Sequence, residues 1–179
     1  MKGEYLLFNL LVVAGPLVLS FWGPTYFVHR FRAAAAALVA AAPPFILWDA
    51  LVADRHWFFN PQYTLDLRLA GLPPGELAFF LTVPFACLYS WEMLLKPERG
   101  RTIEGLRVLY LPLLGLAPVG LYLFSVGLEY TGLTLLSLAL VGLIDLVSGV
   151  RVLTHSRFLP FVALVAVFTL AFNGYLLAH

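Results

Sequence analysis

Six long apolar stretches, joined by short polar connections, set the main constraint on how this chain folds. Each is close to the roughly 20 residues that a helix needs to cross a bilayer. Because 61% of the residues are hydrophobic, 12% are charged and the mean hydropathy is +0.90, we expect lipid to be the solvent for most of the chain. The stretches are Tyr5 to Trp22, Ala33 to Ala53, Glu76 to Leu95, Val108 to Ser125, Tyr130 to Ser148 and Phe158 to Ala178.

These stretches predict an all-α polytopic membrane bundle of six transmembrane helices. Backbone polar groups in lipid must be satisfied within helices, so strands are not expected. The connections are too short to hold a water-soluble domain, and we expect residues 1–179 to form a single transmembrane domain.

The distribution of lysine and arginine predicts which way the bundle faces. The connections after the first, third and fifth stretches hold eight of these residues, and the other side holds three. Cytoplasmic loops carry the excess of positive charge, so we expect the N-terminus and the loop over residues 54–75 to lie outside. The eight are Arg30, Arg32, Lys96, Arg99, Arg101, Arg107, Arg151 and Arg157, and the three are Lys2, Arg55 and Arg68.

Several classes of site have no signature in this sequence. Cys87 is the single cysteine and lies inside an apolar stretch, which argues against a disulfide or a thiolate metal cluster. The four histidines are scattered, and no glycine-rich nucleotide-binding pattern occurs. The two lysines, Lys2 and Lys96, lie at helix ends and offer no buried amine. With a net charge of +1, we expect no nucleic-acid partner, and we expect no metal and no cofactor.

A weak internal symmetry has an offset of 125 residues, from Glu4-Tyr5 to Glu129-Tyr130. It predicts parallel repeats that pair the first two helices with the last two, with the fourth helix as the connector and the final helix of the second repeat missing. Leu- and Ala-rich helices also match one another by coincidence, and that alternative stays open.

Asp49 and Glu76 are the candidate chemical groups. Asp49 lies about one turn from the outer end of the second helix, and Glu76 follows Pro73-Pro74-Gly75 at the start of the third, so both are expected at similar depth. The face of the third helix below Glu76 carries Phe80, Val83 and Cys87, with Phe79 adjacent. Asn9 and Asn173 fall in the outer halves of their helices. A cluster of carboxyl and amide groups is predicted.

Each acidic residue also has a simpler interpretation. Proline followed by glutamate is an ordinary way to start a helix, so Glu76 has a structural alternative. Asp49 lies inside an apolar run with no adjacent cation, which favours function. Glu92 and Asp145, beside Lys96 and Arg151, are interpreted as paired interface residues.

Prolines within the apolar stretches leave a small transporter as another alternative. Discontinuous helices near the bilayer midplane are typical of transporters. A proline in a membrane helix is also often a tolerated kink. The residues concerned are Pro43, Pro44, Pro84, Pro112 and Pro118.

Two segments carry a resemblance to a known family. The pattern W-D, then W-F-x-N-P-x-Y-T-L, then R-L-x-G-L-P-x-x-E-L-x-F-F resembles the lycopene cyclase domain of integral-membrane, heterodimer-type carotenoid cyclases. The match is strongest from Trp48 to Glu92, and Phe172-Asn173-Gly174 is similar to the approach to the family's second motif. The family has two three-helix units, each with a Pro-x-Glu-Glu motif. Here Gly75 replaces the first glutamate, and the second motif is absent.

The resemblance implies a cofactor-free, non-redox isomerase that forms ionone-type end rings on lycopene or another polyisoprenoid lipid. It implies Glu76 as the acid and Asp49 as its partner or the base. Aromatic faces would stabilise the cation, and two amides would orient the site. The aromatic candidates are Trp48, Trp57, Phe58, Phe79 and Phe80, and the amides are Asn60 and Asn173. The expected location is a prokaryotic cytoplasmic membrane.

The altered motif keeps a second interpretation open, namely an inactive carotenoid-binding membrane subunit. For a cyclase, we expect the chain alone to be inactive or weak, with activity requiring a second cyclase subunit, a homo-oligomer or a longer C-terminus. We also expect Gly75→Glu to raise activity or leave it unchanged.

Overall fold

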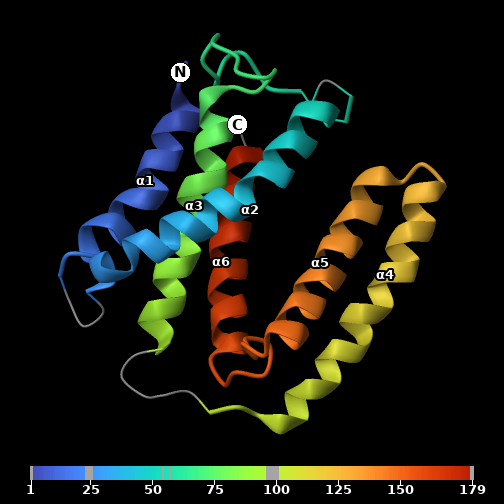
Figure 1. Cartoon of the computed structure of the whole chain (residues 1–179). Helices are drawn as coiled ribbons and strands as arrows, with labels where there is room; N and C mark the ends of the chain where they lie inside the picture. Colours follow the sequence, from blue (N-terminus) through green and yellow to red (C-terminus); the bar gives the residue numbers. More distant parts are fainter. Residues whose placement is uncertain (1, 23–25, 54, 57, 96–100, 178–179) are drawn as a thin grey trace. The chain divides into compact units, whose positions relative to one another are not determined.

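The computed structural model describes residues 2–22, 26–53, 55–56, 58–95 and 101–177, except for the side chains at positions 95, 172, 173 and 175–177. The chain divides into two compact units, Met1–Pro97 and Glu98–His179 (Figure 1). Within the described residues each unit has three α-helices and no strand, with only two isolated β-bridges. The predicted all-α fold with six long helices is therefore confirmed.

The first unit consists of α1 (Glu4–Leu19), the short 3-10 helix η1 (Phe27–Arg30), α2 (Phe31–Val52) and α3 (Pro74–Leu95). Both α1 and α2 pack against α3, and α2 crosses it obliquely (Figure 1). All three long helices continue through internal prolines, as expected for tolerated kinks. The helix interruptions that a transporter site would use are absent from these described segments.

A cluster of aromatic rings packs the start of α2 against α3 in the first unit. Phe27 and Tyr89 are buried, and Phe27 packs edge-to-face on Phe31, Phe85 and Tyr89 with ring centroids 5.7–6.0 Å apart. Each such pair adds stabilisation beyond simple burial. This cluster packs the start of α2 against the second half of α3.

The loop between α2 and α3 is anchored at that opposite end. Its Leu72 is fully buried and bridges Leu69 in a tight turn just before α3. The backbone N–H of Tyr5 donates to the carbonyl of Tyr63 at 3.3 Å, and Lys2 pairs with Asp66 at 2.6 Å. These contacts attach the start of α1 to the loop and bring it beside the start of α3.

The second unit consists of the 3-10 helix η2 (Glu104–Leu109), α4 (Tyr110–Ser125), α5 (Glu129–Ser148) and α6 (Phe158–Leu177). Helices α4 and α5 form a close hairpin (Figure 1). A Cβ atom on Gly132 would lie 2.8 Å from the carbonyl oxygen of Gly120 and 2.7 Å from the backbone nitrogen of Phe124. Small residues at this crossing let the two backbones approach, as is common between membrane helices.

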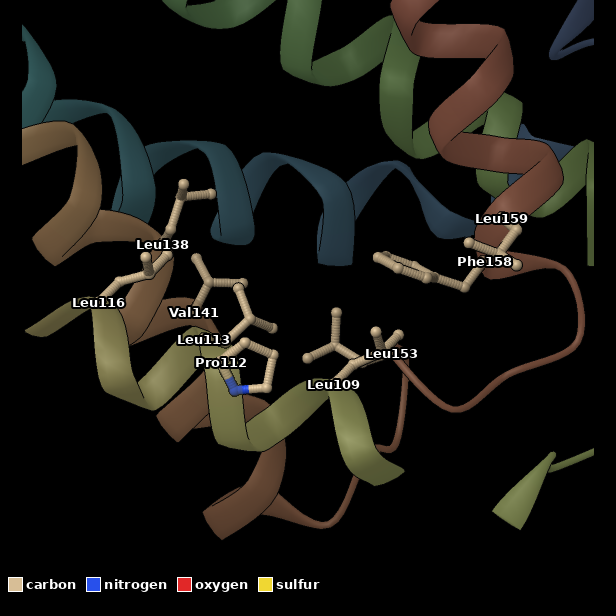
Figure 2. Close-up of a pocket in the computed structure, with 9 residues that line it drawn as sticks. All are labelled: Leu109, Pro112, Leu113, Leu116, Leu138, Val141, Leu153, Phe158 and Leu159. Carbon is tan, nitrogen blue, oxygen red and sulfur yellow. The ribbon is translucent and has the colours of Figure 1, made fainter. Parts of the chain in front are cut away.

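An apolar cavity of about 550 Å³ lies within the second unit. Figure 2 shows hydrocarbon side chains of α4 and α5 pointing into it, with the α5–α6 loop and the start of α6 along its rim. The lining includes Leu113, Leu116, Leu138, Val141, Leu153 and Phe158. With apolar side chains around it, this cavity suits a hydrocarbon chain but supplies no group for proton transfer.

Among the residues that the structure describes, four helical segments are long and apolar enough to cross a membrane. They are Phe27–Val52, Pro74–Leu94, Glu104–Ser125 and Glu129–Ser148, whereas Glu4–Leu19 and Phe158–Ala171 are shorter apolar segments. At 1.5 Å per residue, the 16 residues of α1 span about 24 Å, somewhat less than a typical hydrocarbon core. The lengths and composition are those of a membrane protein.

The predicted parallel repeat has mixed support from helix boundaries. Helices α1 and α5 both begin at a Glu-Tyr pair, as the symmetry requires. However, α4 packs against α5 and belongs to the second unit, so it does not serve as a separate connector. The repeat itself stays a prediction.

Candidate functional site

Glu76 lies in the first turn of α3, where the start of α1 meets it. Pro73 precedes the helix and its carbonyl accepts the backbone N–H of Glu76 at 3.0 Å. The hydroxyl of Tyr5, in the first turn of α1, donates to Oε2 of Glu76 at 2.7 Å. The side chain is only partly exposed, so this hydrogen bond is one of its main polar contacts.

Asp49 reaches the same place from the last turn of α2. Its residue is 9% exposed, and its carboxyl group lies close enough to that of Glu76 for the two to interact electrostatically. Two carboxylates this close repel each other, which favours the state in which one of them holds a proton, as in the dyad of aspartic proteases. This placement agrees with the expectation that the two carboxyl groups lie at similar depth, and their role as a site stays a prediction.

No cation neutralises this carboxyl pair among the residues that the structure describes. The ion pairs of the first unit, Lys2–Asp66 and Arg30–Glu92, involve other acids. The polar groups beside Glu76 in the described structure are the Tyr5 hydroxyl and the Asp49 carboxyl group. Such a pair can donate a proton and accept one.

Asn9 braces the backbone beneath the carboxyl pair. It is 1% exposed, and its Nδ2 donates to the carbonyls of Tyr5 and Gly75, each at 2.9 Å. Its Oδ1 accepts the hydroxyl of Thr82 at 2.7 Å. The predicted amide beside the carboxyl groups is therefore present, but it holds α1 against α3 and does not bond to either carboxyl.

Gly75 is the point of closest approach between α1 and α3 at the site. A Cβ atom there would lie 2.8 Å from Cδ1 and 3.2 Å from Cγ of the Tyr5 ring, and 3.4 Å from the backbone nitrogen of Leu6. A glutamate at this position would displace the ring that holds Glu76. This packing argues against the expectation that Gly75→Glu raises activity or leaves it unchanged, which stays a prediction.

The aromatic candidates lie in different settings. Phe79 and Phe80 on α3 form an edge-to-face pair with centroids 5.8 Å apart, and Trp48 is half-buried next to Asp49. Phe58 is 76% exposed on the α2–α3 loop. Trp57 lies outside the described residues. Contact with a substrate stays a prediction for all five.

The two amide candidates are not brought to the carboxyl pair by any described hydrogen bond. Asn60 shapes the α2–α3 loop, since its Oδ1 accepts the N–H of Gln62 at 3.0 Å and its carbonyl accepts those of Tyr63 and Thr64. Asn173 is on α6 in the second unit, and its side chain lies outside the described residues.

Two acids have partners other than those expected. Asp145 is 7% exposed and accepts the Tyr110 hydroxyl at 2.7 Å, together with the backbone N–H groups of Val152 at 2.8 Å and Leu153 at 3.1 Å. It therefore joins helix α4 to the α5–α6 loop instead of pairing with the Arg151 side chain. Glu92 lies 3.9 Å from Arg30, while Lys96 falls outside the described residues.

Tyr5 and Thr82 were missed as parts of the site. A signal for Tyr5 exists, because it lies four residues before Asn9 and so shares a helix face with it. That spacing does not predict the hydrogen bond from Tyr5 to Glu76 on α3.

The family comparison covers the unit that holds these residues. The model of the lycopene cyclase family matches residues 4–94, just over half of the 179-residue chain. The chain belongs to the lycopene cyclase family. The match takes in α1, α2 and almost all of α3 of this cyclase-family chain, with Tyr5, Asp49 and Glu76 inside it. No curated protein and no solved structure matches the chain.

Proposed function

We propose that this chain is a membrane-embedded subunit of a carotenoid cyclase that closes ionone-type end rings on an acyclic carotenoid such as lycopene. The observation that carries the proposal is the closeness of the buried Asp49 and the partly buried Glu76, between apolar helices of the family-matched unit. A carotenoid is a hydrocarbon, so a substrate that enters from lipid fits a chain whose helices are apolar throughout.

The chemistry needs one acid and one base. Glu76 gives a proton to a carbon of the terminal double bond, and the carbocation closes on the neighbouring alkene with a new carbon–carbon bond. The carboxylate of Asp49 then takes a proton from a carbon beside the ring cation, which forms the ring double bond. Because the two carboxyl groups lie close together, that proton can return from Asp49 to Glu76. Atoms and electrons balance as an isomerisation, with no oxidant and no cofactor.

Aromatic side chains stabilise the intermediate cation in this proposal. A desolvated aromatic face contributes about 2 kcal/mol to binding a cation. Trp48, Phe79 and Phe80 lie within two turns of a carboxyl group along α2 or α3, which supports their assignment. Trp57 and Phe58 belong to the adjoining loop, and Asn60 and Asn173 are assigned to orientation of the site.

A second cyclase subunit or another copy of the chain completes the enzyme. The support is the sequence, which holds one altered acidic motif where the family has two. The location in a prokaryotic cytoplasmic membrane is proposed from the family resemblance alone. The positive charge of the connections supports an N-terminus outside. Cysteine at Gln62, in a Cys87→Ala background, should then react with an impermeant thiol reagent added outside. Reaction only in inverted vesicles would reverse the orientation.

The test is expression in a bacterial host that accumulates lycopene, alone and with a three-helix family unit that carries a complete acidic motif. We expect little product from the chain alone and cyclic carotenoid from the pair, measured by chromatography. Unchanged lycopene in both cultures would overturn the cyclase proposal. Efficient bicyclic product from the chain alone would overturn the need for a partner.

The alternative is a carotenoid-binding subunit without catalysis, and Gly75 in the acidic motif is the observation that favours it. Lycopene that copurifies with the chain and is never converted, even with the partner present, would support this alternative.

A further inference from the structure

Tyr5 and Gly75 form a contact that bears directly on the acid of the proposed reaction. The Tyr5 ring lies where a side chain on Gly75 would otherwise project, since an added Cβ would come within 2.8 Å of it. From this position its hydroxyl donates to Oε2 of Glu76 at 2.7 Å. Glycine at position 75 thus allows a phenol to approach the carboxyl group.

Two hydrogen bonds anchor the backbone of Tyr5, which carries the ring. Its backbone carbonyl accepts Asn9 Nδ2, which also bonds to the carbonyl of Gly75. Its backbone N–H donates to Tyr63 in the loop. The hydroxyl therefore reaches Glu76 from an anchored backbone, and the geometry of the hydrogen bond depends on the packing of α1 against α3.

We propose that Tyr5 is a positioning residue that orients Glu76 and decides which of its oxygens carries the transferable proton. In a carboxylic acid the carbonyl oxygen is the better acceptor, so a hydroxyl donated to Oε2 leaves the acidic proton on Oε1. The Asp49 carboxyl group then receives a hydrogen bond from a fixed direction. This order, from Tyr5 to Glu76 to Asp49, resembles the way a third group orients the base of a catalytic triad. The inference rests on the proposed cyclase function for its kinetic part only.

Infrared spectroscopy of the purified full chain tests the orientation without any reaction. The C=O stretching band of a protonated carboxyl group shifts to lower wavenumber when its carbonyl oxygen accepts a hydrogen bond. Glu76→Gln identifies the band by removing it.

Tyr5→Phe keeps the ring over Gly75 but loses the hydroxyl, and we expect the band to move to higher wavenumber. Gly75→Ala should move it in the same direction although Tyr5 is intact. Tyr122→Phe, on the exposed face of α4, is the control and should leave the band unchanged.

The kinetic arm uses the same variants in the cyclase complex. Loss of a hydrogen bond to the reacting acid should lower kcat about 10- to 100-fold in Tyr5→Phe. KM should stay the same, because the hydroxyl contacts Glu76 and not the substrate. A purely structural role for Tyr5 would lower the amount of folded protein without changing kcat per folded molecule.

The outcomes separate the two proposals. An unmoved Glu76 band in Tyr5→Phe, or a moved band with unchanged kcat, would overturn the role of Tyr5. If the wild-type complex cyclises nothing, the proposed function fails, and the infrared comparison alone still decides whether Tyr5 orients Glu76.

Discussion

Each unit places a tyrosine hydroxyl 2.7 Å from a carboxyl oxygen, with Tyr5 on Glu76 in the first unit and Tyr110 on Asp145 in the second. The remaining partners differ. Asp145 receives further N–H donors from the backbone of the α5–α6 loop, whereas Glu76 meets a second carboxyl group, that of Asp49. A carboxyl group surrounded by hydrogen-bond donors is stabilised as an anion, whereas a neighbouring carboxyl group favours a proton on one member of the pair.

The comparison separates a structural carboxyl group from a reactive one. Asp145 closes a turn in which Gly149 and Arg151 both have positive φ angles, 67° and 62°, and its hydrogen bonds hold that strained backbone. Among the described residues, no backbone N–H donates to the side chain of Glu76. The same Tyr-to-carboxyl contact therefore stabilises a loop in one unit and leaves a proton available in the other.

The largest expected effect is on catalysis and distinguishes the two pairs. Glu76→Gln retains the shape of the side chain but removes the acid, so the cyclisation rate should fall by about 10²- to 10⁴-fold. Asp145→Asn should retain the wild-type rate per folded molecule within a few-fold, since no reacting proton is assigned to it. Both rates are measured as cyclic product formed per amount of folded cyclase complex.

Wild-type turnover by Glu76→Gln would reduce Glu76 to a helix-start residue and remove the contrast between the pairs. A deep loss of rate in folded Asp145→Asn would also contradict it, because the reactive group would then lie in the second unit.

A smaller effect, on stability, should have the opposite order. Asp145→Asn replaces one acceptor oxygen by an NH₂ group that faces backbone donors, so the free energy of unfolding should fall by about 1–3 kcal/mol. The matched change Asp49→Asn should leave stability within about 1 kcal/mol, because the new amide can donate to Glu76. Detergent-denaturation curves of the two variants measure the difference. Equal losses would mean that both carboxyl groups serve mainly to hold the fold.

The apolar pattern was sufficient to predict the helices and one key contact of the site. Segment lengths near the bilayer thickness gave six helices, and the depth of Asp49 and Glu76 along their helices placed the carboxyl groups together. The reason is that both properties depend on position along a helix, which the sequence states directly.

Contacts between helices could not be predicted in the same way. The sequence offered Arg151 as the neighbour of Asp145, but the turn after α5 presents backbone N–H groups instead. It offered Gly75 as a lost glutamate, whereas the packing of Tyr5 gives that glycine a steric reason. Both facts depend on which helix face meets which neighbour, and nearly uniform Leu- and Ala-rich helices carry little information about that.

The smallest expected effect concerns Asp66, a carboxyl group that meets water and a cation instead of a tyrosine. The hydrogen bond and charge of Lys2, 2.6 Å away, hold the pKa of Asp66 below its ordinary value. A lowered pKa in the folded state stabilises the fold above the ordinary aspartate pKa of about 4, and this contribution is lost as the pH falls through the folded pKa. Wild type should therefore be slightly more stable than Lys2→Met at pH 7, with the difference lost at a pH below the lowered pKa of Asp66 and shrinking in high salt. Denaturation curves of both proteins at the two pH values measure it. A difference in stability that persists at low pH would show that Lys2 acts through packing and not through charge. Asp66 could then not be used as the solvent-exposed carboxyl group with which Glu76 and Asp145 are compared.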